Sequence, residues 1–69
     1  MAATMKTEWV LLSSSGSLEG ILDAIARFYG GERKRIENGQ IIGGRGVLEG
    51  VRVIEKRGRY RFEMEMSAK

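Results

Sequence analysis

The stretch from Val51 to Met66 alternates apolar and charged residues on both sides of Arg57-Gly58, a pattern typical of a β-hairpin. A two-residue turn at Arg57-Gly58 places Arg52 opposite Glu63, and this register assigns every side chain to one face. The apolar face is directed toward a core and contains Val51, Val53, Tyr60, Phe62, Met64 and Met66. The pattern therefore predicts a sheet with one buried side.

The opposite face of this hairpin is basic. Its cations are Arg52, Lys56, Arg59 and Arg61, and Glu63 and Glu65 offset them only in part. The planar guanidinium group of arginine suits phosphate and carboxylate partners. The net charge of the chain is only +3, so the placement of the cations is more informative than their sum.

The first thirty residues predict a strand followed by a helix. Thr7–Ser13 is a short apolar run that ends in serines, and we expect it to form a buried central strand. Ser17 can cap a helix, and Gly30-Gly31 can end it, because glycine accepts the left-handed conformation. The apolar stripe of this helix is Leu18, Ile21, Leu22, Ile25 and either Phe28 or Tyr29.

The middle of the chain predicts a second hairpin. Asn38-Gly39 is a typical two-residue turn, and it places Glu37 opposite Gln40 and Ile36 opposite Ile41. Glycines at 43–46 then interrupt the strand pattern, which fits a loop, a bulge or a wide turn.

Together these elements predict an α+β fold, a single two-layer domain over residues 6–66 in the order β-α-β-β-β-β. One helix packs on a mostly antiparallel sheet, and we expect residues 1–5 and 67–69 to be disordered. The uncovered face of the sheet carries the arginines, with Arg33 and Arg35 beside them. The helix stripe is expected to pack against Trp9 or Leu11, Ile36, Val51, Val53, Phe62 and Met64.

The composition argues against several functional classes. The chain of 69 residues contains neither cysteine nor histidine, and its acidic residues are scattered, so we expect no enzyme, metal site or cofactor. No apolar run approaches the roughly 20 residues that cross a bilayer, and the first residues lack the apolar stretch of a signal peptide. We therefore expect a cytoplasmic protein without a membrane partner, in which a second copy could stabilise so small a domain.

Two short motifs have alternative interpretations. Ser13–Ser17, which leads into the helix, is either a capping loop or an anion site, and it lacks the lysine of a nucleotide-binding P-loop. Ile41-Ile-Gly-Gly-Arg-Gly46 resembles the Ile-Ile-Gly-x-x-Gly stretch of the KH family, over six residues. This resemblance implies a glycine loop between two helices that clamps single-stranded nucleic acid. Asn38-Gly39 would break the preceding helix, and Val47, Gly50, Val51 and Val53 are poor helix formers, so a hinge or bulge is the alternative.

These observations favour a small, basic, non-enzymatic accessory protein that binds DNA or RNA through the arginine-rich sheet face. The candidate contact residues are Arg52, Lys56, Arg57, Arg59, Arg61, Arg33, Arg35 and Arg45. The alternative is a protein–protein interaction module, or a small inhibitor or regulator of the phage or plasmid type. It would bind an acidic protein partner or form a homodimer through a sheet edge. In a third interpretation, the charges serve only solubility.

Overall fold

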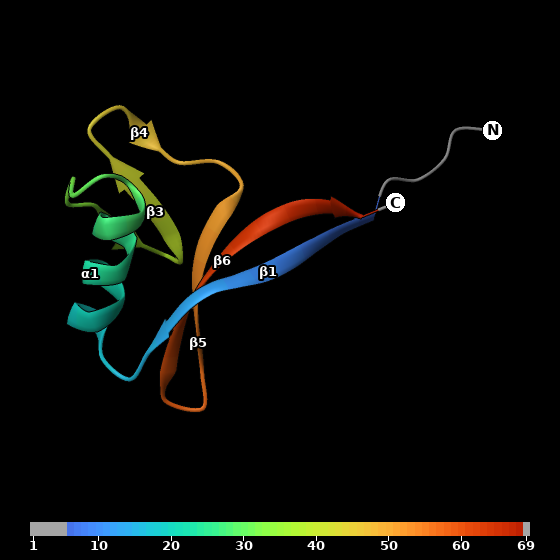
Figure 1. The fold of residues 1–69 in the computed structure, drawn as a ribbon, viewed down its shortest axis with the longest axis horizontal. Coiled ribbons are helices and arrows are strands. Elements are labelled where there is room, and N and C mark those ends of the chain that lie inside the picture. The colour runs from blue at the N-terminus through green and yellow to red at the C-terminus, as the bar shows by residue number, and fades with distance from the viewer. Residues whose placement is uncertain (1–5, 69) are drawn as a thin grey trace.

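The computed structural model describes residues 6–68 and confirms the α+β class, with one helix packed against antiparallel strands (Figure 1). The elements in chain order are β1 (Lys6–Ser15), α1 (Leu18–Phe28), β2 (Arg35–Glu37), β3 (Gln40–Gly43), β4 (Gly46–Val47), β5 (Val51–Lys56) and β6 (Arg59–Ala68).

The strands form two sheets, where the sequence predicted one. The first sheet has the order β1-β6-β5 and the second the order β2-β3-β4. They separate because β3 packs on one face of the first sheet, so that Ile41 is buried against Val51 and Val53. A backbone hydrogen bond of 2.8 Å, donated by the amide of Val53 to the carbonyl of Gly39, joins the two sheets.

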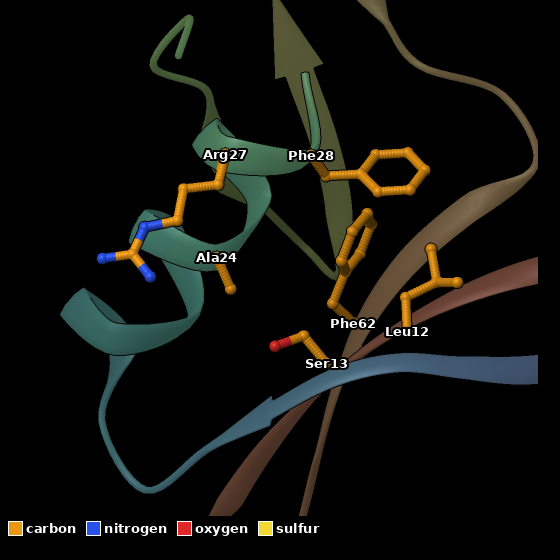
Figure 2. Close-up of a pocket in the computed structure, with 6 residues that line it drawn as sticks. All are labelled: Leu12, Ser13, Ala24, Arg27, Phe28 and Phe62. Atoms are coloured by element: carbon orange, nitrogen blue, oxygen red, sulfur yellow. The ribbon is translucent and has the colours of Figure 1, made fainter. Parts of the chain in front are cut away.

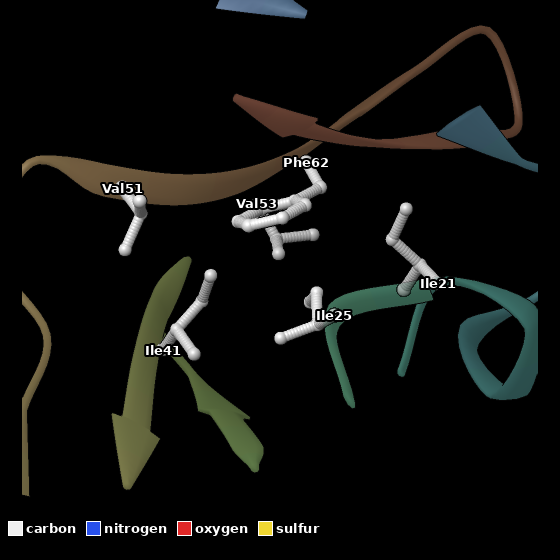
Figure 3. Packing of buried hydrophobic residues seen from close by; sticks show 6 residues of the cluster. All are labelled: Ile21, Ile25, Ile41, Val51, Val53 and Phe62. Carbon is white, nitrogen blue, oxygen red and sulfur yellow. The ribbon is translucent and has the colours of Figure 1, made fainter. Parts of the chain in front are cut away.

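The core lies between the first sheet on one side and both α1 and β3 on the other (Figure 3). Its buried members are Ile21, Ile25, Ile41, Val51, Val53 and Phe62. Full burial of an aliphatic or aromatic side chain contributes about 1.5–3 kcal/mol, so these few residues are the main apolar contribution to stability. Tyr29, Ile36, Leu48, Tyr60 and Met64 pack around them.

The predicted register of the last hairpin is confirmed over its whole length, from Val51 opposite Met64 to Lys56 opposite Arg59. Arg57 and Gly58 have φ angles of 55° and 78°, which match the left-handed pair of a type I′ turn. Glu55 is exposed and accepts a hydrogen bond from the amide of Gly58, so it belongs to the solvent margin of the apolar face.

The helix and the middle hairpin are also confirmed. The hydroxyl of Ser17 accepts a hydrogen bond from the amide of Gly20, which is the expected N-cap. Gly30 and Gly31 have φ angles of 76° and 92° and end the helix as predicted. Ile36 lies opposite Ile41 across the Asn38-Gly39 turn.

The prediction of a buried central strand at Thr7–Ser13 is wrong. The central strand is β6, and β1 is an edge strand that is exposed along most of its length. A mostly apolar run can belong to a buried strand or to an exposed edge, and the sequence pattern is the same in both cases. Trp9 and Leu11 lie opposite Glu65 and Glu63, so they occupy the face of the sheet that α1 does not cover.

The strands β1 and β6 continue beyond β5 as a two-stranded arm, which points away from α1 and the second sheet in Figure 1. Met66 lies in this arm and is 52% exposed, so its predicted place in the core is wrong. Ser67 and Ala68, in the terminus for which the sequence predicted disorder, lie opposite Thr7 and Lys6 of β1. The predictions for residues 1–5 and 69 lie outside the described residues.

The stretch that resembles the KH motif is a tight β-hairpin. Gly43 lies opposite Gly46 at the end of the β3–β4 pair, with Gly44 and Arg45 between them. Strands flank these glycines on both sides, where the KH motif requires helices, so the KH expectation is wrong.

Candidate nucleic-acid interface

The first sheet presents one face that no other element covers among residues 6–68, and we call it the open face. The cross-strand pairs of the first sheet show which side chains point to this face, away from α1. They include Trp9, Leu11, Ser14, Arg52, Ile54, Lys56, Arg59, Arg61, Glu63 and Glu65. The sequence predicted the arginine side of this surface.

The centre of the open face is an ion-pair cluster around Glu63, which is only 4% exposed. Arg52 Nη2 lies 2.7 Å from one carboxylate oxygen of Glu63, and Arg61 Nε donates to the other at 2.9 Å. Burial alone raises the pKa of Glu63, but the hydrogen bonds from Arg61 and Arg52 and their charges outweigh it. The pKa of Glu63 therefore lies below its ordinary value.

Trp9 borders this cluster on β1. The guanidinium carbon of Arg52 lies 4.0 Å from the centroid of the Trp9 ring, within the range of a cation–π contact. Trp9 is 37% exposed, so part of its ring remains open to solvent. The open face therefore combines a partly exposed indole with arginines on neighbouring strands.

The end of the open face near the Arg57-Gly58 turn holds a cavity of about 350 Å³ with a strongly cationic lining. It is formed by Ser14, Lys56, Arg57, Arg59 and Arg61. We call this group the basic tip. Arg59 Nε donates to Ser14 Oγ at 3.3 Å, which holds the guanidinium group at the cavity. Four cations and one hydroxyl line the cavity without a carboxylate, so it suits an anion such as a phosphate.

The remaining candidate residues lie elsewhere. Arg33 and Arg35 were expected on the arginine face, but Arg33 binds Glu19 and Asp23 of α1, and Arg35 in β2 binds Glu37. Arg45 is in the β3–β4 turn. The second sheet packs on the opposite side of the first sheet, which separates all three from the open face.

Lys34 belongs to the same basic cluster in the sequence, but its side chain is only 7% exposed. Its Nζ donates to Glu32 at 2.7 Å and lies 5.3 Å from the centroid of the Tyr29 ring. This hydrogen bond, together with the charge of Lys34, lowers the pKa of Glu32. Arg33, Lys34 and Arg35 are therefore all engaged in ion pairs with nearby carboxylates.

The serine loop before α1 acts as a capping loop. Ser17 caps the helix, and the hydroxyl of Ser15 accepts a hydrogen bond from the amide of Ser17. Ser14 is the member of this loop that contributes to the basic tip.

A second cavity, of about 410 Å³, lies between α1 and β1 on the other side of the sheet (Figure 2). Phe28 is 50% exposed there, although its ring makes an edge contact with Phe62 at a centroid distance of 5.4 Å. Figure 2 shows Leu12 and Ser13 on the β1 side and Ala24 and Arg27 on the helix side. We call this cavity the α1–β1 groove.

The sequence pattern of the last hairpin alone could not predict two features of the site. The position of Trp9 depends on the pairing of β1 with β6, and Glu63 is buried on the central strand, between Leu11 of β1 and Arg52 of β5. The available signal was the alternation of β1, which puts Trp9 and Leu11 on one side and Val10 on the other.

Comparison with known proteins yields no match to a protein family model, to a curated protein or to a solved structure. Within residues 6–68, no helix has the length and apolar content that a bilayer crossing needs. The same residues contain no group of three or more acidic side chains placed to hold a metal ion.

Proposed function

We propose that this chain is a non-enzymatic nucleic-acid-binding protein that contacts the phosphate backbone with its basic tip. The observation that carries the proposal is the cavity lined by Lys56, Arg57, Arg59 and Arg61 together with the Ser14 hydroxyl. Cations gathered in this way release counterions from a nucleic acid and give affinity with little sequence preference.

The position of Trp9 favours unpaired bases over a duplex. Aromatic side chains on an exposed sheet can stack on splayed bases, and each stack contributes about 1–3 kcal/mol. Trp9 and the basic tip share the open face, so a strand whose backbone follows the tip can extend a base toward the indole.

The test is fluorescence anisotropy with labelled single-stranded DNA, single-stranded RNA and duplex DNA at several salt concentrations. The double variant Arg57→Ala/Arg59→Ala should bind more weakly, and its log–log salt slope should be shallower by about 1.4 for single strands. The matched control is Arg35→Ala/Arg45→Ala, which removes the same charge away from the open face and should retain most of the affinity.

Two results would overturn this proposal. One is the absence of binding even at low salt, and the other is equal weakening in the two double variants. Trp9 is the only tryptophan, so quenching of its fluorescence on titration with unlabelled single strands provides an independent readout.

The exposed edge of β1 supports a second candidate function, protein–protein interaction through strand pairing. Trp9, Val10, Leu11 and Leu12 are between 37% and 43% exposed on this edge strand. An exposed apolar edge presents unpaired backbone groups to a further strand.

A further inference from the structure

The longest free strand edge in the described part of the chain belongs to β1. Its ten residues pair with β6 on one side only. The end strands of the second sheet, β2 and β4, have three and two residues. The opposite edge of the first sheet, β5, is charged and is joined to the second sheet through the bond from Val53 to Gly39. A further strand therefore has one extended place to pair.

The composition of β1 lacks the usual protection of an edge strand. From Trp9 to Ser15 it has no charged residue and no proline, and its charges are confined to Lys6 and Glu8. The register of the β1–β6 pair shifts between Leu11 and Ser13, so Lys6–Leu11 is the longest regular part of β1. Lys6–Trp9 of this segment lie in the arm, beyond the end of β5, and a two-stranded ribbon is marginally stable in water.

We infer that β1 pairs with β1 of a second copy of this chain, in antiparallel orientation, to form a continuous six-stranded sheet with the order β5-β6-β1-β1-β6-β5. The inference rests on the second candidate function and specifies its partner. The self-pairing is isologous, so both copies use the same surface and the assembly closes at two. The outer edges of the resulting sheet are the two β5 strands, which are protected.

The charge distribution allows a second copy to bind in this orientation. Residues that lie opposite each other in an antiparallel pair share one face of the sheet, so the two-fold axis passes between two copies of the same residue, and Val10 is the middle of the apolar stretch Trp9–Leu11. Each basic tip lies just beyond the Ser15 end of β1, about six residues from Val10, or roughly 20 Å at the rise of a β-strand. A two-fold axis between the two copies of Val10 places the two tips at opposite ends of the sheet, about 40 Å apart. This distance is several times the Debye length of about 8–10 Å, so the like charges do not oppose association.

The apolar side chains of β1 fit this arrangement. Trp9 and Leu11 occupy the open face, and Val10 and Met66 lie on the face toward α1. Pairing of the edges therefore brings apolar side chains of the two copies together on both faces. It also places the arm of the partner near the α1–β1 groove, where Leu12 and Phe28 are exposed. A short strand interface of this kind predicts micromolar affinity.

The first test is analytical ultracentrifugation from about 1 to about 500 μM, a range that brackets micromolar association. Val10→Lys places like charges near the two-fold axis and should raise the dissociation constant of the dimer at least tenfold. Val47→Lys is the matched control, because it adds the same charge at an exposed valine of β4, away from β1. Leu11→Lys repeats the test from the open face, and circular dichroism checks that each variant is folded.

The second test measures the orientation. The chain has no cysteine, so Lys56→Cys provides a single site for a nitroxide label near the basic tip. Antiparallel pairing through β1 predicts an interspin distance of about 40 Å from the strand rise.

Three results would overturn the inference. The first is a chain that stays monomeric over the whole concentration range. The second is a dimer whose dissociation constant is the same in Val10→Lys and Leu11→Lys as in Val47→Lys. The third is an interspin distance below about 25 Å, which is too short for antiparallel strands of this rise. A monomer would leave the β1 edge to a strand of another protein. The nucleic-acid proposal would be unaffected, because it is tested at Arg57 and Arg59.

Discussion

At the scale of single residues, Glu63 determines how much of the basic charge is available on the open face. Its carboxylate holds Arg52 and Arg61, whose side chains remain about one-third exposed. Lys56, Arg57 and Arg59 are exposed, and of these only Arg59 donates a side-chain hydrogen bond within the described residues, to Ser14. The cations that are free to contact a ligand are therefore concentrated at the basic tip.

Replacement of Glu63 tests the structural role of this cluster. Glu63→Gln removes the charge that pairs with two guanidinium groups, and we expect a loss of about 1–2 kcal/mol in the free energy of unfolding. Urea denaturation measures it. Glu65→Gln, on the exposed side of the same strand, should change stability by less than about 0.5 kcal/mol. If Glu63→Gln lost no more unfolding free energy than Glu65→Gln, the ion pairs would not stabilise the fold.

The lowered pKa of Glu63 also predicts how stability depends on pH. A carboxyl group with a lowered pKa in the folded state stabilises the protein above its unfolded-state value of 4.5, and this stabilisation disappears as the pH falls through the folded-state pKa. Wild-type stability should therefore fall between about pH 5 and about pH 3. Glu32 also contributes to that fall, so the diagnostic result is a smaller decline in Glu63→Gln than in wild type.

At the scale of elements, turn chemistry was the most predictable part of the chain. Asn38-Gly39 and Arg57-Gly58 each fix a two-residue turn, and a turn fixes the register of its strands. The helix was equally predictable, because its cap, stripe and terminating glycines agree with one another. The division into two sheets was not predictable, because it depends on β3 packing across the first sheet, a non-local contact that leaves no local pattern.

The Asn38-Gly39 turn gives a prediction at this scale. Gly39 has a φ of 79°, and a Cβ there would lie 3.1 Å from the carbonyl oxygen of Val53. Gly39→Ala should therefore destabilise the protein by more than about 1 kcal/mol, as measured by thermal or urea unfolding. Gly44→Ala is the control, because a Cβ at Gly44 has no heavy atom within 4 Å and its φ is not in the left-handed region. Equal stability of the two variants would contradict this account of the turn.

The position of β1 was mispredicted for a reason that also lies in the elements. Whether a strand lies at the edge or the centre of a sheet depends on its neighbours. The neighbour of β1 is β6, more than forty residues later in the chain. The candidate site was therefore half predictable. The arginines followed from the last hairpin alone, whereas Trp9 required the first and last strands to be placed together.

At the scale of the whole molecule, the arm and the packed body should differ in stability. Thr7, Glu8 and Ser67 belong to a ribbon without a third strand, whereas Val53 and Phe62 are buried in the core. In hydrogen exchange at concentrations low enough to keep the chain monomeric, arm amides should exchange faster than those of Val53 and Phe62. Uniform protection along β6 would contradict this expectation.

The pairing of Lys6 with Ala68 has a consequence for the order of folding. The β5–β6 hairpin closes over a two-residue turn, whereas β1 finds its place only after β6 has left the ribosome. Contacts between such distant parts of a chain are entropically costly and slow to form. During synthesis the apolar β1 therefore stays unpaired until β6 has been synthesised. A nascent chain in this state is most open to association with chaperones or with other nascent copies.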